Sequence, residues 1–249
     1  MLGRRLITTF KLSCRSSAMF ANRKTLFVSL FAAPIFEVCT SYFLGRVLDS
    51  PSPTNIALRG LLLSILLMTA TFIVAAFAHD RETGVLAQVI SHRPLDSQYL
   101  TGVILAAVAI STASGIINLG CLALIFPVWS AIISVVDIFP LVLLTGTAFG
   151  ILCAIAVLVL QDPYAALNFL IPFLPLAVGV LVPLSEYPRT IERFLRFVPP
   201  ASSLKSIESG APVFVLSDYL VALALLSLSL LLMRRVAGHF RTKVTLLQA

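Results

Sequence analysis

Apolar residues along the chain gather into six long runs, separated by short stretches that contain charged residues or prolines. The runs cover approximately 25–44, 57–78, 99–126, 138–160, 164–183 and 214–233. Most have about the 20 residues that an α-helix needs to cross a hydrocarbon core of roughly 30 Å. They lack the alternation of apolar and polar positions that is typical of membrane β-strands. The pattern therefore predicts an all-α, polytopic membrane protein with six transmembrane helices.

Prolines modify two of the predicted spans. The break between the third and fourth runs is marked by only four residues: Pro127, Trp129, Asp137 and Pro140. Tryptophan favours the membrane interface and proline interrupts helical hydrogen bonding, so we expect the fourth span to begin near position 138. The fifth run contains Pro172 and Pro175, which predict a kink or an interruption.

Residues 1–22 have the pattern of a helix that lies in the membrane interface. Apolar positions recur every four residues, at Leu2, Leu6, Phe10 and Cys14, and basic residues fall on another face. A disordered basic tail is the alternative interpretation. Because no compact apolar core precedes a small-residue cleavage site, we expect the first apolar run to be retained as a span.

The charged segment 79–93 directly follows the second apolar run. It predicts a short helix with one apolar face, formed by Val85, Leu86, Val89 and Ile90. Asp80 and Glu82 would stand at the amino end of this helix, where the helix dipole favours negative charge. A mere connection between spans needs no apolar face. The segment therefore predicts a cytoplasmic element that docks its apolar face on a partner.

The segment 185–212 is too polar for a span but contains two stretches that can form short helices, separated by Pro199 and Pro200. The first stretch concentrates apolar side chains: Ile191, Phe194, Leu195, Phe197 and Val198. These features predict an external re-entrant helical hairpin before the last span, with Phe194, Phe197 and Pro199 as an external gate. A plain external loop is the alternative.

Composition and charge agree with a membrane protein. The 249 residues are 59% hydrophobic and only 12% charged, and the mean hydropathy is +1.01. A soluble domain of this size carries about twice that share of charge. The net charge of +7 arises from basic residues that flank the spans, so membrane orientation explains it better than nucleic-acid binding. With the amino terminus inside, twelve basic residues lie on the inner side and six on the outer side, which predicts two cytoplasmic termini.

Few residues are candidates for catalysis or for ligand binding. The chain has no GxxxxGK(S/T) loop, so we expect no ATP site of this kind and no enzymatic activity in the chain itself. The cysteines and histidines show neither metal-ligand nor disulfide spacing. Glu37 and Asn118 lie within apolar runs and are candidates for a substrate pathway. The alternatives are a Glu37 carboxyl group that reaches water near the outer interface and an Asn118 that hydrogen-bonds between helices.

The stretch HDRETGVL after the second run resembles the acidic-Arg-Glu-x-Gly-x-Leu pattern of the type-2 ATP-binding-cassette permeases. The interfacial helix, the six spans and the polar hairpin before the last span are similar to that family in order and spacing, over nearly the whole chain. Val85 departs from the pattern, because threonine is common there. The resemblance implies that the residues coupling the chain to an ATPase are Asp80, Arg81, Glu82, Gly84, Val85 and Leu86.

The resemblance also implies the wider assembly. Residues 1–249 would be one permease domain in a bacterial or archaeal plasma membrane, exporting a hydrophobic or amphipathic cargo such as a drug, a peptide or a lipid. Two cytoplasmic ATPase subunits would bind ATP and Mg, and a second permease chain, identical or related, would complete the exporter among the membrane lipids. We expect no cofactor and no nucleic acid on this chain. The alternatives are a secondary carrier driven by an ion gradient and a membrane-embedded enzyme.

Overall fold

The computed structural model describes residues 2–16, 22–47, 52–92, 96–126, 129–182, 184–209 and 215–247. Within these ranges the regular elements are all helices. They are α1 (Leu2–Ser16), α2 (Arg23–Phe27), η2 (Val28–Ala32), α3 (Ala33–Val47), α4 (Pro53–Glu82), α5 (Val85–His92), α6 (Ser97–Ile125), α7 (Trp129–Val159), α8 (Ala165–Ala177), η3 (Leu184–Glu186), α9 (Arg189–Leu195), α10 (Ala201–Ser209) and α11 (Val215–Leu247).

Among the described residues, five helical stretches are long and apolar enough to cross a membrane. They are Arg23–Val47, Pro53–Glu82, Ser97–Ile125, Val135–Val159 and Leu216–His239. Each of them overlaps one of the runs predicted from the sequence. The chain is therefore an all-α protein whose long apolar helices fit a multi-pass membrane protein.

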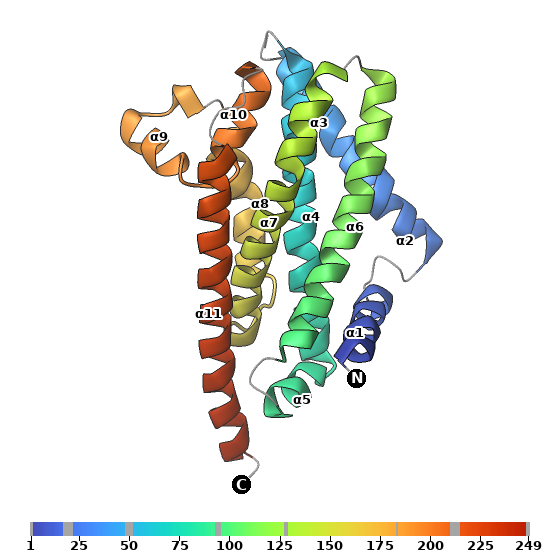
Figure 1. The fold of residues 1–249 in the computed structure, drawn as a ribbon, viewed down its shortest axis with the longest axis vertical. Helices are drawn as coiled ribbons and strands as arrows, with labels where there is room; N and C mark the ends of the chain where they lie inside the picture. Colours follow the sequence, from blue (N-terminus) through green and yellow to red (C-terminus); the bar gives the residue numbers. More distant parts are fainter. Residues whose placement is uncertain are drawn as a thin grey trace.

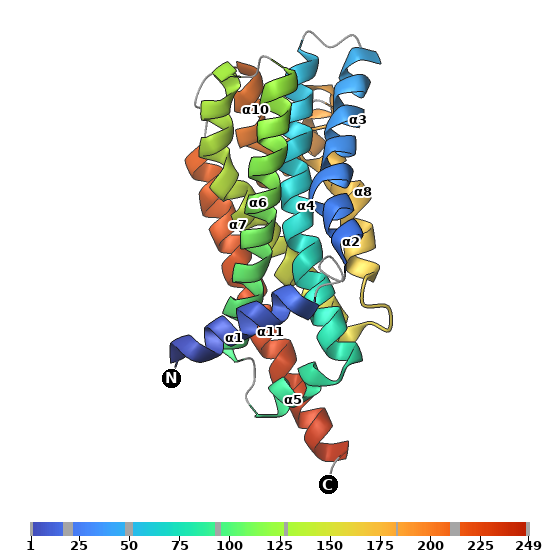
Figure 2. The ribbon, with the colours of Figure 1, turned by 90° about the vertical axis from the view of Figure 1, so that its right-hand side faces the viewer.

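Helix α4 lies in the centre of the bundle, against α3, α6 and α7 (Figure 1, Figure 2). It is buried along most of its length, whereas α11 is largely exposed. Gly146 and Gly150 on α7 allow the close approach to α4, because a Cβ at Gly146 would lie 2.6 Å from the carbonyl oxygen of Leu66. Small residues of this kind let membrane helices pack by direct backbone contact.

The fourth long helix begins earlier than predicted. Helix α7 starts at Trp129 and continues without a break through Asp137 and Pro140. Asp137 is exposed, so its carboxylate does not need to leave solvent or headgroups to join the helix. Neighbouring helices allow a proline inside a membrane helix. The helix therefore extends ahead of the predicted span, whereas its long apolar stretch, Val135–Val159, begins close to position 138. Pro127 lies outside the described residues.

The fifth predicted span, 164–183, does not form one continuous helix, and its crossing of a membrane stays a prediction. Helix α8 has only 13 residues, which is about 20 Å at a rise of 1.5 Å per residue. It passes through Pro172 and Pro175 and ends at Ala177. The chain then turns at Gly179, whose φ of +75° is a conformation that favours glycine.

Short helices that connect the long ones lie at the two ends of the bundle. Helix α5 and the carboxyl end of α11 lie toward one end, at the bottom of Figure 1, whereas α9 and α10 lie toward the other. Helix α8 runs along the bundle between these ends (Figure 1, Figure 2). The described parts of the two segments predicted to face opposite sides of a membrane, 79–92 and 185–209, thus stand at opposite ends of the structure.

Helix α1 lies across the bundle near the end that carries α5 (Figure 2). It rests on α6 at Gly102, where a Cβ would lie 2.7 Å from Cγ2 of Thr9. Phe10 and Cys14 pack against the core, and Leu12 is exposed. A helix is therefore present within the predicted range 1–22, although residues 17–21 lie outside the described part, and its place in a membrane interface stays a prediction.

Candidate coupling segment and membrane cavity

The segment after α4 differs from the single short helix predicted over 79–93. No glycine or proline stands between Ala78 and Gly84, so α4 continues past its apolar run to Glu82. Gly84 then turns the chain with a φ of +76°, and α5 begins at the next residue. The expected position of Asp80 and Glu82 at the amino end of a helix is therefore wrong, because both lie in the last turn of α4.

Asp80 and Arg81 make their contacts within the chain. The Tyr99 hydroxyl on α6 donates a hydrogen bond to Oδ2 of Asp80 at 2.6 Å. Arg81 Nη1 donates to the carbonyl oxygens of Val157 and Leu160, at the carboxyl end of α7. The last carbonyls of a helix lack intrahelical donors, and an arginine both satisfies them and complements the helix dipole. These two side chains therefore tie the end of α4 to α6 and α7.

Helix α5 also packs mainly within the chain, against α4 and α11. Leu86 and Ile90 are only 3% and 5% exposed and belong to the hydrophobic core. The expectation that the whole apolar face of this helix is free for a partner is therefore wrong. Glu82 and Val85 are exposed, so they form the outward surface of the turn between α4 and α5.

A cavity of about 550 Å³ lies between α3, α4 and α8. Its lining is mostly apolar and includes Glu37, which is half-buried on α3. The Ser64 side chain on α4 hydrogen-bonds the Glu37 carboxyl group. The structure thus places one of the two predicted substrate-pathway residues in the wall of a cavity.

Asn118 has a different place, beside the irregular part of the first span. Pro34 has no N–H, so it cannot donate to the carbonyl oxygen of Leu30 four residues earlier. The helix widens there into the π-turn η2, in which the Ala33 N–H bonds the Val28 carbonyl group. Asn118 Nδ2 and Ser114 Oγ on α6 donate to the Leu30 oxygen at 2.9 and 3.1 Å.

Asn118 therefore acts as a hydrogen-bond donor between helices, which is the alternative that the sequence left open. The cavity lining does not include it. Its side chain donates a hydrogen bond to the Leu30 carbonyl oxygen, which cannot accept one from Pro34 because proline has no N–H. Ser29, Ala33 and Pro34 line the cavity. Asn118 therefore stabilises the irregular helical stretch that forms this wall, through its hydrogen bond to Leu30.

Replacing Asn118 with Leu should lower stability, because the Leu30 carbonyl group loses its shorter hydrogen bond inside the bundle. We expect a cost of about 1 kcal/mol, the scale of hydrogen bonds between membrane helices. Thermal unfolding in lipid nanodiscs measures it. Asn168→Leu on the exposed face of α8 is the matched control and should change the midpoint little. Equal midpoints for the two variants would contradict this role of Asn118.

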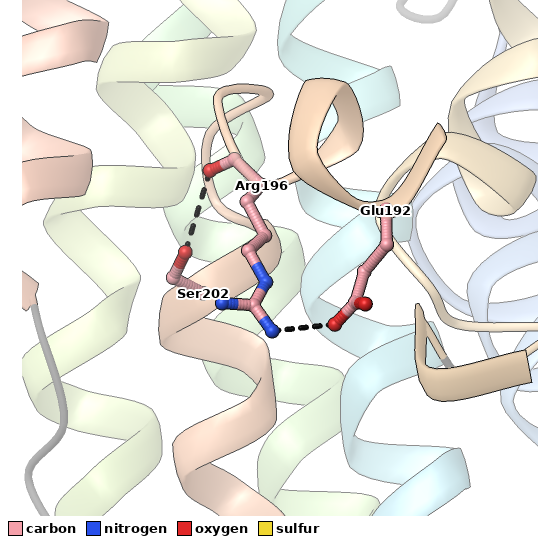
Figure 3. Close-up of polar contacts among 3 residues, drawn as sticks. All are labelled: Glu192, Arg196 and Ser202. Atoms are coloured by element: carbon pink, nitrogen blue, oxygen red, sulfur yellow. Dashed lines mark hydrogen bonds and ion pairs between the residues drawn. The ribbon is translucent and has the colours of Figure 1, made fainter. Parts of the chain in front are cut away.

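At the opposite end, α9 and α10 form the polar segment before α11. Phe194 and Phe197 are 73% and 71% exposed, whereas Pro199 is buried. Arg196 pairs with Glu192 one helical turn away, and the Ser202 hydroxyl donates to the Arg196 carbonyl oxygen at 3.4 Å (Figure 3). The ion pair lowers the pKa of Glu192, but exposed pairs of this kind stabilise little. The role of this segment as a gate stays a prediction.

Two buried charged side chains make contacts that the sequence did not predict. Asp218 on α11 is 3% exposed, and its Oδ2 accepts hydrogen bonds from the backbone N–H and the hydroxyl group of Ser203, both at 2.7 Å. Arg59 on α4 is 5% exposed and donates to the Gly179 carbonyl oxygen at 3.2 Å. The only available signal was a charge inside an apolar run. Asp218 holds α10 on α11, and Arg59 holds the turn after α8.

The sequence matches no protein-family model, and it matches no curated protein. Within the described ranges, no group of three or more His, Cys, Asp or Glu side chains is placed to hold a metal ion. The contacts of the coupling segment and the cavity are therefore the basis for a functional proposal.

Proposed function

We propose that this chain is the permease subunit of an ATP-driven exporter of the type-2 ATP-binding-cassette class. The observation that carries the proposal is the HDRETGVL stretch. Its Asp80 and Arg81 tie it to α6 and α7, whereas Glu82 and Val85 remain exposed. A coupling element needs both properties, because it must contact an ATPase on one side and move the spans on the other.

The proposed membrane topology has six crossings. Helix α8 and the irregular residues that follow it make the fifth, so that α9 and α10 lie on the outer side and both termini in the cytoplasm. Arg81 contacts the Leu160 carbonyl group, which supports a cytoplasmic position for the turn before α8. The half-buried Glu37 and the mostly apolar cavity suit a hydrophobic or amphipathic cargo. The membrane is the cytoplasmic membrane of a bacterium or an archaeon.

Motion would pass from the ATPase to the cavity through α4. A push on Glu82 and Val85 acts on the end of α4, and the contacts of Asp80 and Arg81 oblige α6 and α7 to respond. Helix α4 also provides one wall of the cavity. A displacement of its cytoplasmic end therefore changes the shape of the cavity. Two ATPase subunits, which bind ATP and Mg, and a second permease chain complete this assembly.

The test begins with the neighbouring reading frames, in which we expect an ATPase without membrane spans. The full chain is then reconstituted with this ATPase in proteoliposomes. We expect ATP-dependent movement of a hydrophobic cargo and ATP hydrolysis that rises with cargo. An ATPase variant that binds but does not hydrolyse ATP is the control. Transport that follows an ion gradient and ignores ATP would overturn the proposal in favour of a secondary carrier.

Cysteine labelling from outside should show the topology. In a background without the native cysteines, Lys205→Cys on α10 should react with a membrane-impermeant maleimide, whereas Arg5→Cys and Arg241→Cys should not. Asp162→Cys, in the turn before α8, should also be protected. Labelling of both position 162 and position 205 would show that α8 does not cross the membrane.

A further inference from the structure

The cavity between α3, α4 and α8 combines a mostly apolar wall with the carboxyl group of Glu37. Its volume of about 550 Å³ lies within the range of small-molecule pockets, roughly 300–1,000 Å³. Leu67, Met68, Phe72 and Ile171 contribute apolar surface, and Glu37 is the one ionisable residue among the described residues of the lining. The cavity therefore has the size and composition of a site for a compact organic molecule.

The polar groups around Glu37 leave its charge uncompensated. Ser64 hydrogen-bonds the carboxyl group, but a carboxylate can accept about four hydrogen bonds. Among the described residues that line the cavity there is no Lys, Arg or His. A carboxylate in apolar surroundings is costly unless a positive charge or several donors accompany it. A cation is therefore the kind of ligand that complements this carboxylate.

We propose that this cavity binds a lipophilic monovalent cation, an apolar body that carries one ammonium or phosphonium charge. The inference names the cargo class of the exporter proposed above and rests on that function. The apolar body contacts the wall formed by Leu67, Met68 and Ile171, and the positive charge lies beside Glu37. A neutral hydrophobic molecule would leave the carboxylate unpaired, and an anion would be repelled by it.

The irregular helix beside the cavity is an independent indication of a functional site. Ser29, Ala33 and Pro34 line the cavity, and they lie in or directly after the π-turn η2. Short π-turns inside α-helices are frequent at functional sites, because they place side chains where a regular helix would not. Here the π-turn and Glu37 belong to the same stretch, so the site is built from one span against α4 and α8.

The experiment is equilibrium binding of radiolabelled tetraphenylphosphonium to the full chain in nanodiscs of neutral phosphatidylcholine. Empty nanodiscs give the lipid background. We expect saturable binding to the native chain and a loss of affinity of at least roughly tenfold for Glu37→Gln, the usual scale for losing one charge contact. Glu186→Gln, at an exposed acid outside the cavity, should bind like the native chain. Ala75→Phe, which fills the cavity, should also lose binding.

The neutral analogue triphenylphosphine oxide separates charge from shape. Its weak binding should be equal in the native chain and in Glu37→Gln, and that equality also shows that the variant is folded. Equal cation affinity in these two proteins, preference for the neutral analogue, or absence of saturable binding would each overturn the proposal. Binding is measured without an ATPase. A chain that binds the cation through Glu37 but supports no ATP-driven transport would therefore contradict the exporter function and leave the site standing.

Discussion

Glu82→Lys should abolish cargo-stimulated ATP hydrolysis in the reconstituted complex, with a loss of roughly tenfold or more, as expected when a charge contact is reversed. Glu82 is the exposed carboxylate of the HDRETGVL stretch. Its neighbours Asp80 and Arg81 are engaged with α6 and α7, so Glu82 offers the charge that a partner can recognise. ATP hydrolysis with and without cargo measures the effect.

The control for Glu82→Lys is Glu186→Lys, which makes the same charge change at an exposed position near the opposite end of the bundle. This control should retain stimulated hydrolysis. The Glu82 variant should still fold, because the contacts of Asp80 and Arg81 are untouched. Stimulation that survives Glu82→Lys would show that the turn between α4 and α5 does not contact the ATPase.

Asp218→Ala should cause the largest loss of stability among single substitutions at the α9–α10 end. The substitution removes the acceptor for the Ser203 N–H and hydroxyl groups, both at 2.7 Å in a buried site. Hydrogen bonds to a charged group contribute about 1.5–3 kcal/mol each, so we expect a total cost of about 3–6 kcal/mol for the two bonds. Thermal unfolding in nanodiscs measures it.

Two variants accompany Asp218→Ala. Asp218→Asn keeps one acceptor oxygen and should fall between the native chain and the alanine variant. Asp137→Ala removes an exposed carboxylate from α7 and should leave the midpoint nearly unchanged. If Asp218→Ala unfolds at the same temperature as Asp137→Ala, the carboxylate of Asp218 does not hold α10 in place.

The long helices were predictable because the membrane imposes their composition. Five of the six predicted apolar runs correspond, in the right order, to long helical stretches of the described residues, since a span must be apolar throughout its length. Their ends were less accurate. Helix α4 continues beyond Ala78 and α7 begins before Asp137, because a helix ends at a residue that stops hydrogen bonding rather than where apolarity ends. Helix α8 is short for a local reason, the turn at Gly179.

The candidate site was predictable only in part. A carboxyl group in an apolar run identified Glu37 as unusual, and the structure places it at a cavity. The partners of Asp80 and Arg81 were not predictable, because Tyr99 and the last carbonyls of α7 come from distant parts of the chain. Burial of Leu86 and Ile90 depends likewise on α11, which packs on α5 only in the folded chain.

The π-turn at Val28–Ala32 changes the rotational phase of the first span. It holds one residue more than an α-helical turn, and each residue rotates an α-helix by about 100°. A helical wheel drawn through Arg23–Val47 as one regular helix would therefore place Glu37 on the wrong side by about that angle. The side of the bundle that the carboxyl group faces thus depends on the number of residues before it. In this span, the extra residue in the π-turn therefore sets the direction in which Glu37 points, and that direction decides whether its carboxyl group can line the cavity.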